Sequence, residues 1–115
     1  MRRVVVTGIG AVTPVGNDIK TTWDNLVNGV SGIDFIPEER FSTEGLKVKI
    51  AGLVKDFEPT KYFEKKDLRE NDLYTQYAVA AATEAVEDSD ILGKIEEDNF
   101  GVYVGAGIGG LDSFY

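Results

Sequence analysis

Three glycines near the C-terminal end have a spacing that could serve ligand binding. Gly105, Gly107 and Gly110 follow a β-branched segment with the pattern G-x-G-x-x-G. In dinucleotide-binding folds such glycines form a turn that admits a pyrophosphate. That motif normally follows the first strand, whereas here a strand and two helices are predicted before it. The same glycines would equally allow a tight turn and close backbone packing. A nucleotide-binding α/β oxidoreductase therefore stays open as an alternative.

A short basic cluster is the second pattern that could act on a ligand. Lys65, Lys66 and Arg69 stand at positions i, i+1 and i+4. On a helix, Lys65 and Arg69 would share one face. Clusters of this kind attract anions and could dock an acidic partner or a phosphate-bearing carrier. They are also typical of a solvated surface beside acidic residues, and the sequence leaves both interpretations open.

Nucleophilic catalysis is not supported within this segment. The 115 residues include no Cys and no His. The chain thus lacks a thiolate nucleophile and the side chain that most often acts as a general base or metal ligand near neutral pH. We therefore predict no catalytic residue, no metal site and no cofactor here. The hydroxyls left without an activating base are those of Thr7, Thr13, Ser31 and Ser113.

The charge distribution excludes further classes. The formal net charge is −8, from 12 basic and 20 acidic residues, and residues 84–98 hold most of the excess. A nucleic-acid groove needs a net basic stripe, which is missing. Counted from Asp88, the acidic stretch also has Asn99 where a calcium loop has its final Glu. No apolar run approaches the roughly 20 residues that cross a bilayer, nor the core of about 7–15 residues of a secretory signal. We expect a soluble, cytoplasmic protein.

The apolar pattern predicts strands that alternate with helices, which is typical of an α/β sandwich. Residues 33–45 are predicted to be irregular. Asn17 or Asp18 is expected to cap the first helix, and Asp67 with Glu70 has the spacing of a capping box at the start of the second. The predicted strands are 4–7, 47–54 and 100–104, and the predicted helices are 19–30 and 67–88.

The second predicted helix is rich in alanine, and this composition indicates how it packs. Small side chains around a helix let neighbours approach closely, as in a helix buried between layers. The chain then stops soon after its last predicted strand, where natural domains seldom end. We expect the N-terminal portion of a longer protein, unable to fold stably alone because its apolar faces would be exposed.

The order of motifs resembles the N-terminus of the elongating β-ketoacyl-acyl-carrier-protein synthases, type II in particular. The resemblance runs along the whole chain. It rests on residues 2–10, 13–17, 23, 31–33, 51–57, 76–77 and 105–111. It implies that residues 1–115 are the first part of the N-terminal half of a thiolase-like, layered α-β-α-β-α fold, in a homodimer. It also implies decarboxylative condensation of an acyl thioester with malonyl-carrier protein in fatty-acid elongation, with the Cys and His residues lying elsewhere.

The resemblance implies roles for some of these residues. Gly107 and Ile108 match the acyl pocket, where side-chain size limits the length of the acyl chain. Lys66 and Arg69 match positions that dock the acyl carrier protein, and Lys65 stands beside them. Glu70 departs from the family, which can have a further basic residue there. A polyketide ketosynthase, or its non-catalytic chain-length-factor partner, is the alternative within the superfamily.

Overall fold

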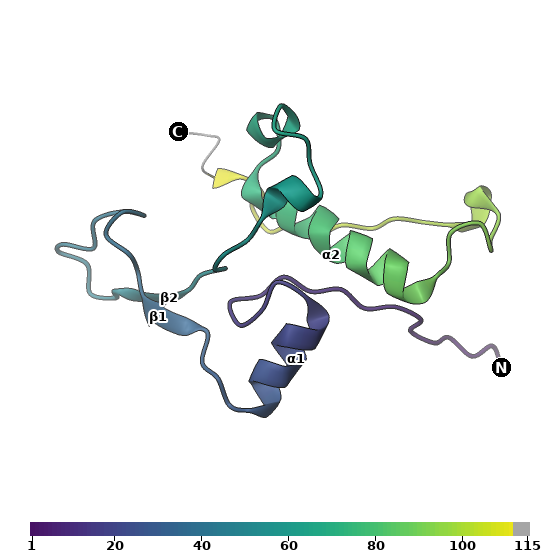
Figure 1. Ribbon diagram of the computed structural model, residues 1–115, viewed down its shortest axis with the longest axis horizontal. Coiled ribbons are helices and arrows are strands. Elements are labelled where there is room, and N and C mark those ends of the chain that lie inside the picture. The colour runs from purple at the N-terminus through teal and green to yellow at the C-terminus, as the bar shows by residue number, and fades with distance from the viewer. Residues whose placement is uncertain (112–115) are drawn as a thin grey trace. The chain divides into compact units, whose positions relative to one another are not determined.

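The computed structural model describes residues 1–111 of the chain, so Ser113 lies outside the described residues. Two compact units are present (Figure 1). One combines Met1–Ala11 with the described residues from Glu58 onward, and the other is Val12–Phe57. The elements, in chain order, are α1 (Ile19–Val27), β1 (Ile33–Phe35), β2 (Ile50–Gly52), the 3₁₀ turns Pro59–Lys61 and Asp67–Arg69, α2 (Leu73–Ser89), and the 3₁₀ turn Glu97–Asn99.

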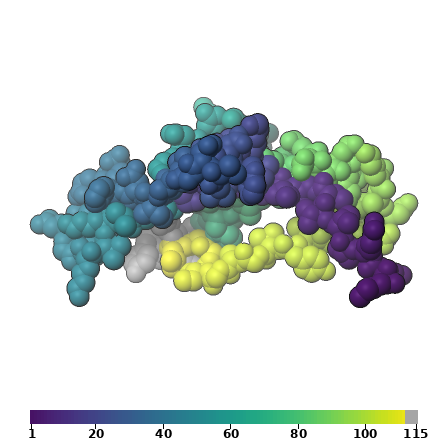
Figure 2. Space-filling model, turned by 90° about the horizontal axis from the view of Figure 1, so that it is seen from below, coloured from purple at the N-terminus to yellow at the C-terminus, as the bar shows by residue number. Residues whose placement is uncertain are grey.

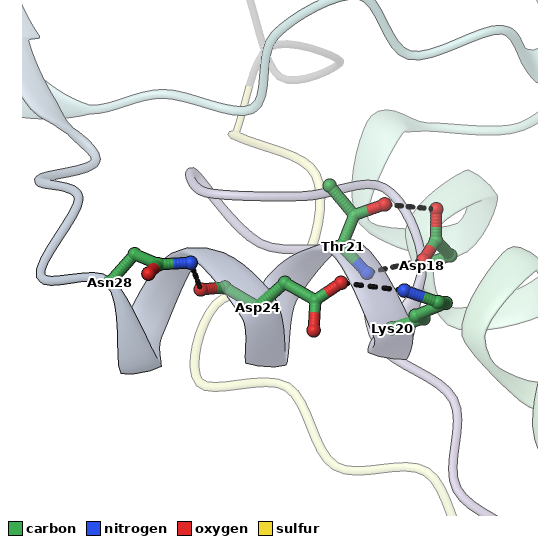
Figure 3. A network of polar contacts seen from close by, with 5 residues as sticks. All are labelled: Asp18, Lys20, Thr21, Asp24 and Asn28. Carbon is green, nitrogen blue, oxygen red and sulfur yellow. Dashed lines mark hydrogen bonds and ion pairs between the residues drawn. The ribbon is translucent and has the colours of Figure 1, made fainter.

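Helix α1 begins at a side-chain cap and ends at a glycine. The Asp18 carboxylate accepts hydrogen bonds from the Thr21 backbone N–H at 2.7 Å and from the Thr21 hydroxyl at 2.8 Å (Figure 3). Lys20 pairs with Asp24 one turn later, with 2.6 Å between Nζ and Oδ2. The helix stops before Gly29, whose φ of 69° favours glycine. The predicted helix and its Asp18 cap are confirmed, with an end three residues earlier than expected.

The cap makes Asp18 sensitive to acid. The hydrogen bonds from the backbone and side chain of Thr21 lower the pKa of Asp18 below its ordinary 3.8. A carboxyl group with a lowered pKa in the folded state stabilises the fold at pH values above its unfolded pKa. That stabilisation is lost as the pH falls through the lowered, folded-state pKa.

We expect Asp18→Ala to lower the free energy of unfolding of the complete protein by about 1 kcal/mol at pH 7, the usual cost of losing an N-cap. The loss should shrink as the solution is acidified below pH 3.8. Asp18→Asn is the control, because Asn caps helices about as well and does not titrate. Denaturant unfolding at a series of pH values measures both. A loss that stays constant at acidic pH would contradict the role of the carboxylate.

A two-stranded antiparallel sheet forms where only one strand was predicted. Strand β1 pairs with β2, with Ile33 opposite Gly52 and Phe35 opposite Ile50. The prediction of irregular structure for residues 33–45 was therefore wrong for β1. Its alternation of apolar and polar residues covers only three positions, too few to indicate a strand, and pairing with β2 is what makes it one. Of the predicted strand 47–54, only Ile50–Gly52 is assigned to the ladder.

Helix α2 starts later than the prediction, because the backbone before it is broken. Residues 67–69 form a separate 3₁₀ turn, and the expected capping box at Asp67 is absent, since no side chain caps that turn. The extended backbone of Asp72 (φ −62°, ψ 158°) separates the turn from the helix. The side chain of Asn71, just before the helix, donates to the Asp67 carbonyl at 2.8 Å and so links the chain at this point to the 3₁₀ turn. The helix ends at Asp90 in the left-handed conformation, with φ 50°.

The N-terminal segment lies against one face of α2. The Ile9 backbone N–H donates to Asp88 Oδ2 at 3.1 Å, and the Ala11 N–H donates to Glu84 Oε2 at 3.0 Å. Between these bonds Gly10 meets the backbone of α2, where an added Cβ would lie 2.9 Å from the amide nitrogen of residue 85. Ala80 on the same helix is only 2% exposed. The prediction that the alanine-rich helix admits a close neighbour is confirmed on this face.

Two predicted strands are extended but unpaired within the described residues. Residues 4–7 and 100–104 belong to no ladder in the part of the chain that the structure describes. Val4 is 95% exposed and Tyr103 is 97% exposed, and Figure 2 shows the yellow C-terminal part of the described chain as an extended string. Within the described chain the strand prediction was therefore wrong for residues 4–7 and 100–104, because a strand needs a neighbour to accept and donate its backbone hydrogen bonds. A segment rich in β-branched and aromatic residues favours an extended backbone, but it does not by itself provide a neighbouring strand to pair with.

No helix within residues 1–111 has both the length and the hydropathy required to cross a bilayer.

Candidate functional site

The predicted pocket residues lie on an exposed bend that follows the extended segment 101–106. Ile108 is 71% exposed, and no described atom beyond its chain neighbours lies within 4 Å of the position where Gly107 would have a Cβ. Gly109 has a φ of 78°, a left-handed conformation that favours glycine. The structure therefore presents the Ile108 side chain on an open surface of the described residues. Its role in an acyl pocket stays a prediction.

The bend is attached to the start of α2. A Cβ on Gly109 would lie 3.6 Å from Cε1 and Cζ of the Tyr74 ring, which is ordinary van der Waals contact. A Cβ on Gly110 would overlap the carboxylate of Asp72 and lie 2.9 Å from its Cβ. Neither Asp72 nor Tyr74 was singled out from the sequence. The signal that could have found them is the pair of consecutive glycines, because a backbone without side chains often marks a close approach.

The basic cluster is exposed, and its three residues come from two short turns. Lys65 and Lys66 precede the 3₁₀ turn Asp67–Arg69, and Arg69 is its last residue. The prediction that Lys65 and Arg69 share one face of an α-helix was wrong, because α2 begins only at Leu73. A 3₁₀ turn has about three residues per turn, so residues four apart do not align along it. The cluster is a local patch rather than a helical stripe.

Acidic neighbours reduce the positive charge of this patch. Lys66 Nζ lies 3.0 Å from Glu64 Oε2, and both side chains are about three-quarters exposed. Lys61 pairs with Glu58 at 3.5 Å in the preceding turn. Exposed pairs of this kind contribute little to stability, and they leave the lysines accessible to a partner. The patch thus fits weak, salt-sensitive docking of an acidic surface.

The unit Val12–Phe57 has an open cleft that the sequence did not predict. The cleft has a volume of about 410 Å³, and it is lined mainly by residues 13–18 together with the facing side chains of Asn25 and Lys55. Asn17 donates from Nδ2 to the Lys55 carbonyl at 2.7 Å. Its Oδ1 atom is buried and has no hydrogen-bond partner among the described residues. The amide groups mainly hold the loop in place, since Asn25 likewise donates to the Val15 carbonyl at 2.6 Å.

Within residues 1–111 there is no group of three or more side chains that could hold a metal ion. With no Cys and no His in the whole sequence, the described surface offers a bend with an apolar side chain and a basic patch. Such features can limit the size of a ligand or dock a partner. They do not make or break bonds.

Comparison with known proteins shows the family. Residues 1–114 match the family model of the β-ketoacyl synthase N-terminal domain. The chain is 46% identical over 114 residues to 3-oxoacyl-[acyl-carrier-protein] synthase 2 of Staphylococcus aureus (strain COL), covering 98% of this chain and 27% of that protein. It is 48% identical over 114 residues to the protein of the same name from Vibrio harveyi, covering 96% of this chain and 26% of that protein.

A solved structure described as "The ishigamide ketosynthase/chain length factor" superposes with a TM-score of 0.68 at 38% identity, covering 87% of this chain and 23% of that chain. The fold class is thus the thiolase-like α/β fold of the ketosynthases. The chain belongs to the β-ketoacyl synthase family, through its N-terminal domain. It spans about a quarter of the length of the curated relatives it matches. This membership favours the condensing-enzyme hypothesis over the nucleotide-binding alternative.

Proposed function

We propose that the complete protein is a 3-oxoacyl-acyl-carrier-protein synthase of type 2, a condensing enzyme of fatty-acid elongation. The observation that carries the proposal is the 46–48% identity to synthases of that name along nearly the whole chain. We also propose that the enzyme is cytoplasmic and homodimeric. Its partners would be acyl-loaded and malonyl-loaded carrier protein.

The proposed reaction has two stages. A Cys thiolate attacks the acyl thioester of one carrier protein, so that an S–acyl bond forms on the enzyme and the carrier thiol leaves. Malonyl-carrier protein then loses CO₂, and the resulting enolate attacks the S-acyl carbonyl. A carbon–carbon bond forms, and the Cys thiolate is released. Because the chain has no Cys and no His, the nucleophile and the histidines must come from outside these 115 residues.

The residues of this chain would contribute recognition rather than bond-making. Gly107 and Ile108 would form part of the acyl pocket, where the size of one apolar side chain limits the length of the acyl tail. Lys65, Lys66 and Arg69 would attract the acidic carrier protein. Support for docking comes from the exposure of all three basic residues, and Glu64 beside Lys66 moderates the charge.

The direct test is condensation by the complete protein. Purified enzyme given acyl-carrier protein and malonyl-carrier protein should release CO₂ and form a 3-oxoacyl-carrier protein two carbons longer than the primer. The polypeptide 1–115 alone is the negative control and should form none. Decarboxylation without carbon–carbon bond formation, or no reaction at all, would contradict the proposal.

A second candidate function is supported by the structural neighbour, whose description names a chain length factor. A chain-length-factor subunit would not condense alone and would act only beside a partner ketosynthase. A polyketide ketosynthase would condense malonyl units repeatedly without reduction of the product between them. Mass analysis of products from the purified protein, alone and with a partner ketosynthase, separates these outcomes from single two-carbon elongation.

The docking role of the basic patch predicts a selective kinetic defect. We expect Lys66→Glu together with Arg69→Glu to raise KM for carrier-bound substrate roughly tenfold, because each reversal replaces attraction by repulsion at an exposed surface. KM for acyl-CoA or pantetheine thioesters should be unchanged. The effect should weaken in high salt.

The matched control is Lys47→Glu with Lys49→Glu, which makes the same change in net charge at two other exposed positions. This double variant should leave KM for carrier-bound substrate close to that of the wild type. Equal defects on both kinds of substrate would indicate misfolding, and an unchanged KM in the Lys66/Arg69 variant would remove the patch from docking.

A further inference from the structure

The bend that carries Ile108 lies close to the start of α2 at two positions, Gly109 and Gly110. The Tyr74 ring lies at van der Waals distance from the position of a Cβ on Gly109. Asp72, immediately before the first residue of α2, fills the space that a Cβ on Gly110 would need. Figure 1 shows the last described residues ending near the start of α2. At both glycines, the backbone of the bend therefore lies next to a side chain from the start of α2.

The Ile108 side chain is not itself held in place by packing within the described residues. It is 71% exposed, and Gly107 before it has open space around it. Its position therefore depends on the backbone of the bend. That backbone is defined by the left-handed φ of 78° at Gly109 and by the contact of Gly110 with Asp72.

We propose that Asp72 and Tyr74 are positioning residues for chain-length selection. They seat the bend against α2 and thereby set how far Ile108 projects toward the acyl tail. This inference rests on the proposed condensing function and on the pocket role of Ile108. Neither Asp72 nor Tyr74 touches substrate in this proposal, so their replacement acts through the position of Ile108.

The effect is visible as a ratio of specificity constants. Each methylene that enters or leaves an apolar pocket changes kcat/KM roughly fourfold. A primer two carbons longer than the limit set by Ile108 therefore differs by about fifteenfold from one that fits. The measured quantity is kcat/KM for a long primer divided by kcat/KM for a short primer, which cancels any general loss of active enzyme.

The first test replaces Tyr74 in the complete protein. Tyr74→Ala removes the ring beside Gly109, so Ile108 can move away from a longer tail, and the ratio should rise several-fold. Tyr74→Phe keeps the Cε1 and Cζ atoms that make the contact, and it should keep the ratio. A ratio that is the same in Tyr74→Ala and the wild type would overturn the proposal. A shift in both variants would assign the effect to the hydroxyl group and overturn it as well.

The second test uses steric rescue, which a merely structural defect would not show. Gly110→Ala places a Cβ against the Asp72 carboxylate, pushes the bend away from α2, and should change the ratio several-fold. Adding Asp72→Gly removes the carboxylate, so the Cβ of residue 110 takes its place against the start of α2, and most of the wild-type ratio should return. Glycine is among the residues that a helix N-cap tolerates well, so the double variant should remain folded. A double variant no closer to the wild type than Gly110→Ala would contradict the contact.

These experiments distinguish failure of the proposed condensing function, of the pocket role of Ile108, and of the positioning role of Asp72 and Tyr74. If the wild-type protein does not condense, the proposed function fails. If it condenses and Ile108→Phe leaves the ratio unchanged, the pocket role of Ile108 fails. If Ile108→Phe shifts the ratio and the Tyr74 and Gly110 variants do not, only the positioning role of α2 fails.

Discussion

Replacing Ile108 by Phe is expected to shorten the range of acyl primers that the enzyme accepts. Phe adds bulk at one wall of the proposed pocket, so methylenes of a long tail that were buried there are excluded. Each excluded methylene costs about 0.8 kcal/mol of binding. Exclusion of four methylenes would therefore lower kcat/KM roughly 200-fold. Initial rates with acyl-carrier primers of increasing length, with products identified by mass, give the profile.

Ile108→Leu is the matched control for this substitution, because it retains the volume and the apolar character of the side chain. Its chain-length profile should stay close to that of the wild type. A uniform fall at all lengths in Ile108→Phe would indicate a general defect in folding or catalysis. An unchanged profile would place Ile108 outside the pocket.

Adding a side chain at Gly10 is expected to give the largest loss of stability among the substitutions considered. In Gly10→Val the Cβ would lie 2.9 Å from both the Ala81 carbonyl carbon and the Ala85 amide nitrogen. Both atoms belong to the backbone of α2, which has no flexible end that could move aside. Overpacking of this kind costs about 1–3 kcal/mol.

The same substitution would pull the N-terminal segment off α2 and weaken the hydrogen bonds to Glu84 and Asp88, which flank Gly10. Bonds to charged groups contribute about 1.5–3 kcal/mol each. We therefore expect the free energy of unfolding of the complete protein to fall by about 3 kcal/mol or more. Denaturant unfolding followed by circular dichroism measures this loss.

Gly45→Asn is the control for glycine replacement. Gly45 has a φ of 77° and open space around it, and Asn is one of the few residues that tolerates this conformation. Its stability should change by less than about 1 kcal/mol. Equal losses at Gly10 and Gly45 would mean that close approach to α2 is not the cause.

Local signals in the sequence were sufficient where an element is stabilised by its own residues. Asn17 or Asp18 was predicted as a helix cap, and the structure selects Asp18, whose carboxylate accepts the Thr21 N–H. The alanine-rich helix was predicted and forms α2. Its start was placed too early, because the extended backbone of Asp72 interrupts an otherwise helical pattern.

Predictions that depended on a distant neighbour were less successful. Strand β1 was missed because β2, some 15 residues later in the chain, supplies its hydrogen bonds. Residues 4–7 were predicted as a strand, and no partner strand exists for them among residues 1–111. For the candidate site, the basic residues came from their spacing in the sequence, and the pocket role of Ile108 came from a resemblance in motif order. The close approach of Gly109 to Tyr74 and of Gly110 to Asp72 could not be found that way.

By itself, the sequence determined that this segment has no thiol and no imidazole of its own, roughly where its two main helices lie, and to which family it belongs. Composition and motif order are properties of the chain in one dimension, so they require no knowledge of contacts. Only the tertiary structure decided which extended segments are paired and which backbone meets α2. Those outcomes depend on atoms that lie far apart in the chain and are a few ångströms apart in space, as Gly10 and Ala81 are.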